Sequence, residues 1–164
     1  MPDSLKIREI TDRDDPVLTD VEHLFLDMYD YMQQHGLVIG LSSDGHQKWM
    51  EGMKNGLGRF GVLFVSLLND KVTGFAHGSI RLSPDYLGNK KLGVITHIHL
   101  KESCRRQGAG NALVKALEVW FAEQHVHSVE LQVLSDNLPA RGFWNKLGYH
   151  DELMQCRKKG DDLR

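Results

Sequence analysis

Apolar side chains recur along this chain with two different spacings, and the change between them predicts where strands and helices lie. Residues 5–11 and 128–134 alternate apolar and polar side chains, which is typical of strands with one buried face. Residues 17–32 and 111–125 carry apolar side chains three and four positions apart, as amphipathic helices do. Together with apolar β-branched runs, caps and glycine stops, these patterns predict strands at 5–11, 62–68, 72–82, 92–100, 128–134 and 149–157, and helices at 17–32, 42–56, 111–125 and 136–148.

The links between these elements predict how the sheet is arranged. Asn69-Asp70-Lys71 is a natural hairpin connection, so the two strands that it joins should be antiparallel. Strands 92–100 and 128–134 are joined through a helix, so a parallel pair is expected there. We therefore expect an α/β (α+β) fold, with a mixed, mostly antiparallel twisted sheet flanked by helices. A length of 164 residues with 41% hydrophobic residues suits a single domain over 1–164, with 158–164 as a frayed tail.

The charge balance of the sequence indicates which classes of binding partner to expect. With 20 basic and 22 acidic residues the net charge is −2, and neither sign forms a long block, so neither a nucleic acid nor a membrane partner is expected. Cys104 and Cys156 show no metal-ligand spacing and are expected as reduced thiols. Because the charged start of the sequence lacks an apolar signal core and no stretch approaches a membrane span, a cytoplasmic location is expected.

The turn Arg105-Arg106-Gln107-Gly108-Ala109-Gly110 lies between a predicted strand and a predicted helix. Glycines there let the backbone bend and approach a ligand, and the amides of a helix start attract anions such as a pyrophosphate. The two arginines add charge-assisted hydrogen bonds. Two glycines by themselves are also compatible with a plain tight turn. The turn lacks the Gly-Lys-Ser/Thr ending of a P-loop and the downstream acidic residue of a dinucleotide site, which disfavours nucleoside triphosphates and NAD.

Three motifs in order resemble the GCN5-related N-acetyltransferase (GNAT) superfamily. The glycine turn fits the family signature of Gln or Arg, two residues, Gly, one residue, then Gly or Ala. Ile98-His99-Leu100 lies just upstream, and the stretch from Asn137 to Tyr149 is similar to the family's Asn-x-x-Ala and Leu-Gly-Phe ending. The predicted order of elements is also similar to that of the family over nearly the whole chain.

The resemblance implies a GNAT-like acyl-CoA N-acyltransferase fold in which the fourth and fifth strands splay apart and admit acetyl-CoA. The pantetheine arm would pair with the fourth strand like an added strand, and the phosphates would lie on the turn. It implies contacts with the cosubstrate from Ile98, His99, Leu100, Arg105, Arg106, Gln107, Gly108, Ala109, Gly110, Asn111, Asn137 and Trp144.

The positions that the family uses for proton transfer carry other residue types in this sequence. Its frequent general base, a Glu or His, aligns with Val94 or Thr96, neither of which accepts a proton at neutral pH. His97 and His99 are nearby candidates. Strand alternation puts these two histidines on the face opposite Val94 and Thr96 unless a bulge intervenes.

The family's usual acid, a tyrosine, aligns with Trp144, which has no titratable proton and is expected to pack the core or the thioether end of the cofactor. Protonation of the thiolate then falls to a bound water or to a tyrosine. The tyrosines in question are Tyr29, Tyr31, Tyr86 and Tyr149. A covalent acyl intermediate on Cys104 is disfavoured because the sequence pairs it with no base. No metal is expected, because His97 and His99 lack a third ligand at a typical spacing.

The leading hypothesis is an acetyl-CoA-dependent N-acetyltransferase that acts on a primary amine of a small molecule by direct attack in a ternary complex. A cationic acceptor is expected near the first two helices and loop 83–91. Asp27, Asp30, Tyr31 and Trp49 are its candidate contacts, although the acids are equally typical of a solvated helix face. The alternatives are acetylation of a protein or peptide amine, a catalytically silent coenzyme A-binding module, and a metal-binding protein using the nine histidines. Either a monomer or a homodimer is compatible with the sequence.

Overall fold

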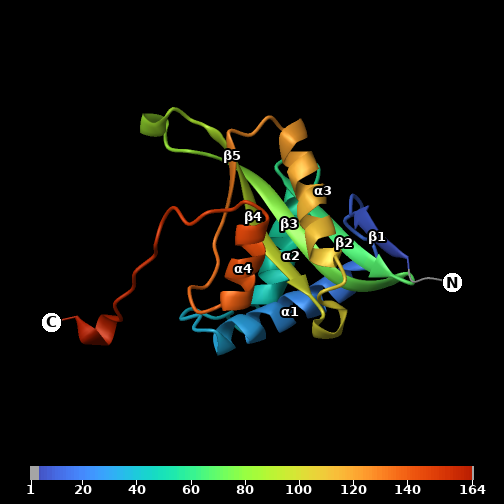
Figure 1. The fold of residues 1–164 in the computed structure, drawn as a ribbon, viewed down its shortest axis with the longest axis horizontal. Helices are drawn as coiled ribbons and strands as arrows, with labels where there is room; N and C mark the ends of the chain where they lie inside the picture. The colour runs from blue at the N-terminus through green and yellow to red at the C-terminus, as the bar shows by residue number, and fades with distance from the viewer. Residues whose placement is uncertain (1–3, 164) are drawn as a thin grey trace.

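One twisted sheet of five strands organises the computed structural model, which describes residues 4–163 (Figure 1). The strands follow one another across the sheet in chain order. They are β1 (Leu5–Glu9), β2 (Gly61–Leu68), β3 (Lys71–Leu82), β4 (Lys91–Leu100) and β5 (Ser128–Leu131). Each of the first four strands is antiparallel to its neighbours among them, and β5 is parallel to β4, so the expected mixed, mostly antiparallel sheet is confirmed.

Helices cover both faces of this sheet (Figure 1). They are α1 (Leu18–Gln34), α2 (Gly45–Gly56), α3 (Ala109–Glu123) and α4 (Leu138–Lys146), with short 3-10 turns at Asp85–Leu87, Glu102–Cys104 and Gly160–Asp162. On one face, α1 and α2 enclose a core around Phe25, Leu63 and Phe75. On the other face, α3 and α4 enclose a second core around Leu117, Phe121 and Trp144. Burial of these apolar helix faces is the main source of stability for such a two-sided sheet.

The predicted hairpin and the cap of the last helix are confirmed in detail, whereas no side-chain cap hydrogen bond forms at the start of α2. Asn69 and Asp70 both have positive φ angles, 51° and 62°, as the two central residues of a type I′ hairpin turn require. At the start of α4, Oδ1 of Asn137 accepts a hydrogen bond from the amide of Ala140 at 3.3 Å. Gly148 follows that helix with a φ of 88°, the left-handed conformation typical of a residue just past a helix end.

The strand predicted at 149–157 is wrong for this structure. Residues 150–163 are exposed, and among them only the short turn at Gly160–Asp162 is regular. The predicted strand 128–134 is also too long, because β5 ends at Leu131, where its pairing with β4 ends. In both places the alternating pattern is present but no neighbouring strand completes the ladder, and a strand needs one. Residues 1–3, the beginning of the charged stretch that argued against a signal sequence, and Arg164 of the expected tail lie outside the described part.

Within residues 4–163, none of the helices combines the length and apolarity needed to cross a membrane.

Candidate functional site

The edge of β4 that faces β5 is open over half of its length. The two strands pair from Leu92–Ser128 to Ile95–Leu131, and β4 then continues to Leu100 without β5 beside it. The amide of Lys101 donates to the carbonyl of Thr73 on β3, so by strand alternation the main-chain groups of Ile98 and Leu100 point to the open side. Consistently, the carbonyl of Leu100 accepts a hydrogen bond from Nε of Arg105 at 3.4 Å. This is the splay that the family resemblance implied, and it leaves a strand-like surface for an extended ligand.

The glycine turn follows this open edge and leads into α3. Arg106 and Gly108 have φ angles of 63° and 85°, so the backbone is left-handed at both positions. Nothing lies within 4 Å of where a Cβ on Gly108 would stand. The first helical hydrogen bond is donated by Ala112 to Gly108, and the three amides before it point out of the helix start. Backbone donors, a helix dipole and two arginines therefore converge on a site suited to a pyrophosphate.

Gly110 allows close packing between neighbouring elements, and it does not expose the backbone to a ligand. A Cβ at this position would lie 3.3 Å from the ring of Phe143 on α4 and 3.5 Å from the side chain of Leu100. Gly110 itself is buried. The absence of a side chain thus lets the start of α3 approach α4 and the end of β4, which fixes the turn against the open edge.

Arg105 connects the turn to the helix on the opposite face of the sheet. Besides its hydrogen bond to Leu100, its guanidinium lies over the ring of Tyr31 on α1, 5.0 Å from the ring centroid. Such a cation–π contact holds the guanidinium in one place without neutralising its charge. Arg106 is exposed beside it. Both guanidinium groups keep their charge, and their contact with a phosphate at the turn stays a prediction.

Two further residues expected to contact the cosubstrate have structural roles in α4. Oδ1 of Asn137 is engaged as the helix cap, so its amide nitrogen is the group that remains for a bound pantetheine arm. Trp144 is 6% exposed and packs edge-on against Phe143 and Tyr149 in the second core. The core-packing interpretation of Trp144 is therefore correct in this structure, and a contact with the thioether end stays a prediction.

A bulge in β4 changes which residues share a face. His97 pairs with His77, but the next pair along is Ile95 with Gly78, so Thr96 is an extra residue on β4. Val94 pairs with Ser79, which lies on the same face of β3 as His77. Val94 and His97 therefore face the same side. Regular alternation, which would put the two histidines opposite Val94 and Thr96, does not hold here, because the exception allowed for in that prediction, a bulge, is present.

The bulge also places a hydroxyl between two histidines. Oγ1 of Thr96 lies 2.5 Å from Nδ1 of His77 and 2.9 Å from Nδ1 of His97. The same hydroxyl donates its one proton to the carbonyl of His77 at 3.1 Å. It must then accept from both rings, which makes each histidine an Nδ1–H tautomer with its lone pair on Nε2. Neither His77 nor the role of Thr96 was inferred from the sequence, since nothing in the strand pattern signals a bulge.

Both candidate histidines are held in the neutral form. Burial, with a further contribution from His77, lowers the pKa of His97 to about 3. Burial and the charge of Arg105 lower the pKa of His99 to about 4, while Asp27 acts in the opposite direction. His97 lies among the rings of Phe25 and Trp49, at centroid distances of 5.3 and 5.2 Å. A neutral imidazole can accept a proton, whereas an imidazolium cannot.

The tyrosines separate into two groups. Tyr29 and Tyr31 lie on the histidine face, with ring centroids 6.4 Å from His97 and 6.2 Å from His99 respectively. Burial raises the pKa of Tyr29 above its usual value. The hydroxyl of Tyr149 instead donates to Glu118 on α3 at 2.8 Å, and Tyr86 is 85% exposed in the loop after β3. The structure therefore brings only Tyr29 and Tyr31 near the candidate histidines.

Of the exposed acidic side chains on α1 and just before α4, Asp27 lies near a candidate histidine. Asp27 and Asp30 are exposed on α1, and Asp27 is near enough to His99 to influence its pKa. The carboxylate of Asp136, before α4, lies 3.4 Å from where a Cβ on Gly36 would stand. Trp49 stacks on Phe25 with a centroid distance of 4.1 Å and is half-buried, so it is largely a core residue.

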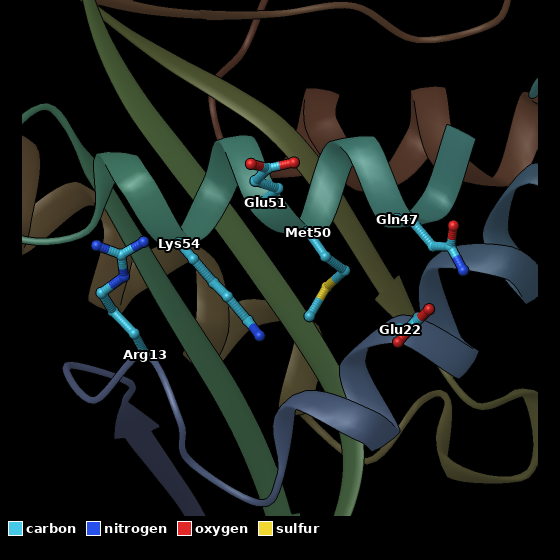
Figure 2. A pocket seen from close by; sticks show the side chains of 6 residues that line it. All are labelled: Arg13, Glu22, Gln47, Met50, Glu51 and Lys54. Carbon is cyan, nitrogen blue, oxygen red and sulfur yellow. The ribbon is translucent and has the colours of Figure 1, made fainter. Parts of the chain in front are cut away.

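A separate hollow lies between α1, α2 and the segment that precedes α1 (Figure 2). Its volume is about 390 Å³, and it is lined by Arg13, Glu22, Gln47, Met50, Glu51 and Lys54. These side chains carry both charges, and none of the residues expected to contact a cosubstrate or move a proton is among them. We therefore assign the hollow no part in the candidate site. Within residues 4–163, no group of three or more His, Cys, Asp or Glu side chains is placed to hold a metal ion.

Cys104 is free and partly buried at the end of the 3-10 turn that precedes Arg105. Its sulfur lies 3.6 Å from Oγ of Ser103. A serine hydroxyl is no base, so this contact supplies no activation of the thiol. The covalent route through Cys104 therefore gains no support from its surroundings.

Comparison with known proteins gives a family match over most of the chain. The model of the acetyltransferase (GNAT) family matches residues 18–149. An uncharacterised N-acetyltransferase of Methanocaldococcus jannaschii is 34% identical over 102 residues, which are 60% of this chain and 60% of that protein. The match therefore spans less than two thirds of that relative's length.

Solved structures share the fold at low sequence identity. An aminoglycoside N-acetyltransferase, AAC(6')-Iy, in complex with CoA has a TM-score of 0.76 at 17% identity, covering 97% of both chains. A tetramutant of a Bacillus halodurans protein has a TM-score of 0.79 at 18% identity, covering 94% of this chain and 99% of the other.

Proposed function

This chain belongs to the GNAT family of acetyltransferases, and from that premise we propose that it transfers the acetyl group of acetyl-CoA to a primary amine of a small cationic molecule. The amine attacks the thioester carbonyl directly in a ternary complex. The new C–N bond replaces the C–S bond, the amine proton passes to a base, and the departing thiolate of coenzyme A takes a proton from water.

The observation that carries the proposal is the open half of β4, which ends at the anion-binding turn. The main-chain groups of Ile98 and the amide of Leu100 point to that side without a strand beside them, and the amides at the start of α3 follow directly. An extended, amide-containing arm with a pyrophosphate at one end is complementary to this succession of groups. In the proposal, Arg105 and Arg106 neutralise the phosphates, and the amide nitrogen of Asn137 hydrogen-bonds to the arm.

We assign the general base to His97. Its Nδ1–H is held by Thr96, so the lone pair on Nε2 is the group that takes the amine proton. A pKa near 3 keeps that lone pair available across the neutral range. The low pKa also makes His97 a weak base, so the acceptor has to reach it as the free amine. We assign His99 to binding of the acceptor instead, because the charges of Asp27 and Arg105 both influence its pKa.

A small cationic acceptor is favoured by the distribution of carboxylates. Asp27 and Asp30 on α1 and Asp136 before α4 come from two stretches of the chain, and of the three Asp27 is near enough to His99 to influence its pKa. In the proposal these carboxylates bind a molecule that carries more than one amine. One structurally similar protein is an aminoglycoside N-acetyltransferase. Aminoglycosides and short polyamines are therefore the first acceptors to test.

Release of coenzyme A thiol across a panel of amines tests the proposal. The panel contains aminoglycosides, polyamines, monoamines, amino acids and lysine-containing peptides, each with saturating acetyl-CoA. Turnover is expected with polycationic small molecules. Turnover with peptides alone would overturn the small-molecule acceptor. Tight acetyl-CoA binding by calorimetry without turnover on any amine would overturn catalysis and leave a silent coenzyme A-binding module.

A further inference from the structure

The hollow between α1, α2 and the segment that precedes α1 has opposite charges at its two ends. In Figure 2, Arg13 and Lys54 lie on one side of Met50, and Glu22 and Gln47 lie on the other. Met50 is 7% exposed and supplies an apolar surface between the two ends. All of these side chains except Gln47 also line a second hollow of about 250 Å³. The two cations, the carboxylate and the thioether are therefore shared by both hollows.

The opposite charges in this hollow do not pair with each other. Nη2 of Arg13 donates a hydrogen bond to Oδ1 of Asn55, which is a neutral group. Lys54 is partly buried, and its ammonium group forms no ion pair or hydrogen bond within residues 4–163. Glu22 lies 3.5 Å from Nε2 of His46, which forms an ion pair with it only when the imidazole is protonated. Because a partly buried charge gains from a partner, both ends of the hollow favour a charged ligand.

We propose that the hollow is a second binding site, which takes a small zwitterion whose carboxylate and ammonium groups are separated by an apolar stem, as in an ω-amino acid. The carboxylate binds between Arg13 and Lys54, where a guanidinium can hold it by two hydrogen bonds. The ammonium group binds Glu22, and the stem lies on Met50. The volume of the hollow, about 390 Å³, suits a small molecule.

Ligands that carry charge of a single sign are less complementary to this hollow. A carboxylate or phosphate alone leaves Glu22 without a partner, and a polyamine places ammonium groups beside Arg13 and Lys54, where like charges repel. The other acidic side chains that line the two hollows are Asp14, Asp15 and Glu51. Asp15 is already paired with Arg8 at 2.7 Å, and the other two are exposed, so water screens their charge. Glu22 therefore remains as the carboxylate that an ammonium group would meet.

The hollow is separate from the candidate functional site but shares two helices with it. Trp49, next to Met50 on α2, stacks on Phe25 of α1 at a centroid distance of 4.1 Å and lies 5.2 Å from the ring of His97. A zwitterion in the hollow would link the same two helices from a different side. None of the residues assigned to the cosubstrate or to proton transfer lines either hollow, so the ligand is bound there without being acetylated.

Methionine methyl NMR of the full chain tests binding at this place. The probe is 5-aminopentanoate, with pentanoate and pentylamine as single-charge controls, and Met50→Leu identifies the signal of Met50. That signal is expected to shift and saturate with 5-aminopentanoate, and the two controls should bind at least about tenfold more weakly. Saturating acetyl-CoA should not displace the probe. No shift, equal affinity for a single-charge control, or displacement by acetyl-CoA would overturn the proposal.

Charge variants test which end of the hollow binds which group. Lys54→Met removes the ammonium group and keeps an unbranched stem, so it should weaken binding of 5-aminopentanoate by about tenfold or more. Glu22→Gln should weaken it as well but strengthen binding of pentanoate, because the repulsion at that end is removed. Lys48→Met, at an exposed position of α2 outside both hollows, is the matched control and should change neither affinity. Thermal unfolding shows that each variant is folded. Affinities that do not respond to Lys54→Met and Glu22→Gln, or that respond equally to Lys48→Met, would contradict the site.

Discussion

The hydroxyl of Thr96 lies 2.9 Å from Nδ1 of His97, within the bulge of β4. Because the same oxygen donates to the carbonyl of His77, it can only accept from the imidazole. The contact therefore sets the tautomer of the proposed base. Thr96 itself exchanges no proton with a substrate, so it is a positioning residue.

Replacing Thr96 with Val should lower kcat and leave the affinity for acetyl-CoA unchanged. Valine keeps the shape but leaves two imidazole N–H groups without their acceptor, which should also cost about 1–3 kcal/mol of unfolding free energy. Thr96→Ser, which restores the hydroxyl, is expected to recover most of kcat. Nitrogen chemical shifts of His97 should report a loss of the Nδ1–H tautomer in the valine variant. If the valine and serine variants have equal kcat, the positioning role is wrong.

His97→Gln and His99→Gln should affect different kinetic parameters. Loss of the base should reduce kcat by about 10²–10⁴-fold at unchanged acetyl-CoA affinity. The His99 variant should chiefly raise KM for the acceptor, because this side chain is assigned to its binding. Steady-state kinetics at saturating acetyl-CoA separate the two. The opposite result, with kcat lost only in the His99 variant, would transfer the role of base to His99.

Gly108→Val should weaken acetyl-CoA binding by at least about tenfold. A β-branched residue at a φ of 85° is strained by about 1–3 kcal/mol, and relief of that strain moves the donor amides. Gly142→Ala on α4 is the matched control, since nothing lies within 4 Å of its added Cβ. Calorimetric titration with acetyl-CoA measures both. Unchanged affinity in a folded Gly108 variant would mean that the turn does not hold the cosubstrate.

The stability of the fold should fall as the pH drops below about 6.5, the ordinary histidine pKa. Burial lowers the pKa values of His77, His97 and His99 to about 4, 3 and 4. The unfolded chain therefore binds protons first on acidification, and the stability present above pH 6.5 is lost on the way to pH 4. Each histidine contributes a slope of about 1.4 kcal/mol per pH unit in this range.

Chemical denaturation between pH 7.5 and 5 measures this slope. His97→Gln should reduce it by removing one of the three groups, while substitution of the exposed His127 by Gln should leave it unchanged. A pH-independent unfolding free energy over this range would show that the buried histidines are protonated in the folded state.

The sequence by itself determined the order of most elements, the mixed sheet, the family and the glycine turn between β4 and α3. These follow from local patterns: Leu24, Phe25 and Met28 define one helix face, Asn69 and Asp70 define a hairpin, and Gly108 marks a left-handed turn before a helix. Each of these signals depends on residues within a few positions of one another, so each can be detected without the fold.

Only the tertiary structure decided which side chains meet at the site and which strands find partners. One extra residue at Thr96 shifts the register of β4 against β3, and this brings Val94 to the face of His97 and one hydroxyl between two imidazoles. Residues 149–157 have the pattern of a strand but no neighbouring strand among residues 4–163. Bulges and strand pairing depend on long-range contacts, and an alternating pattern records only that a face can be buried, not what buries it.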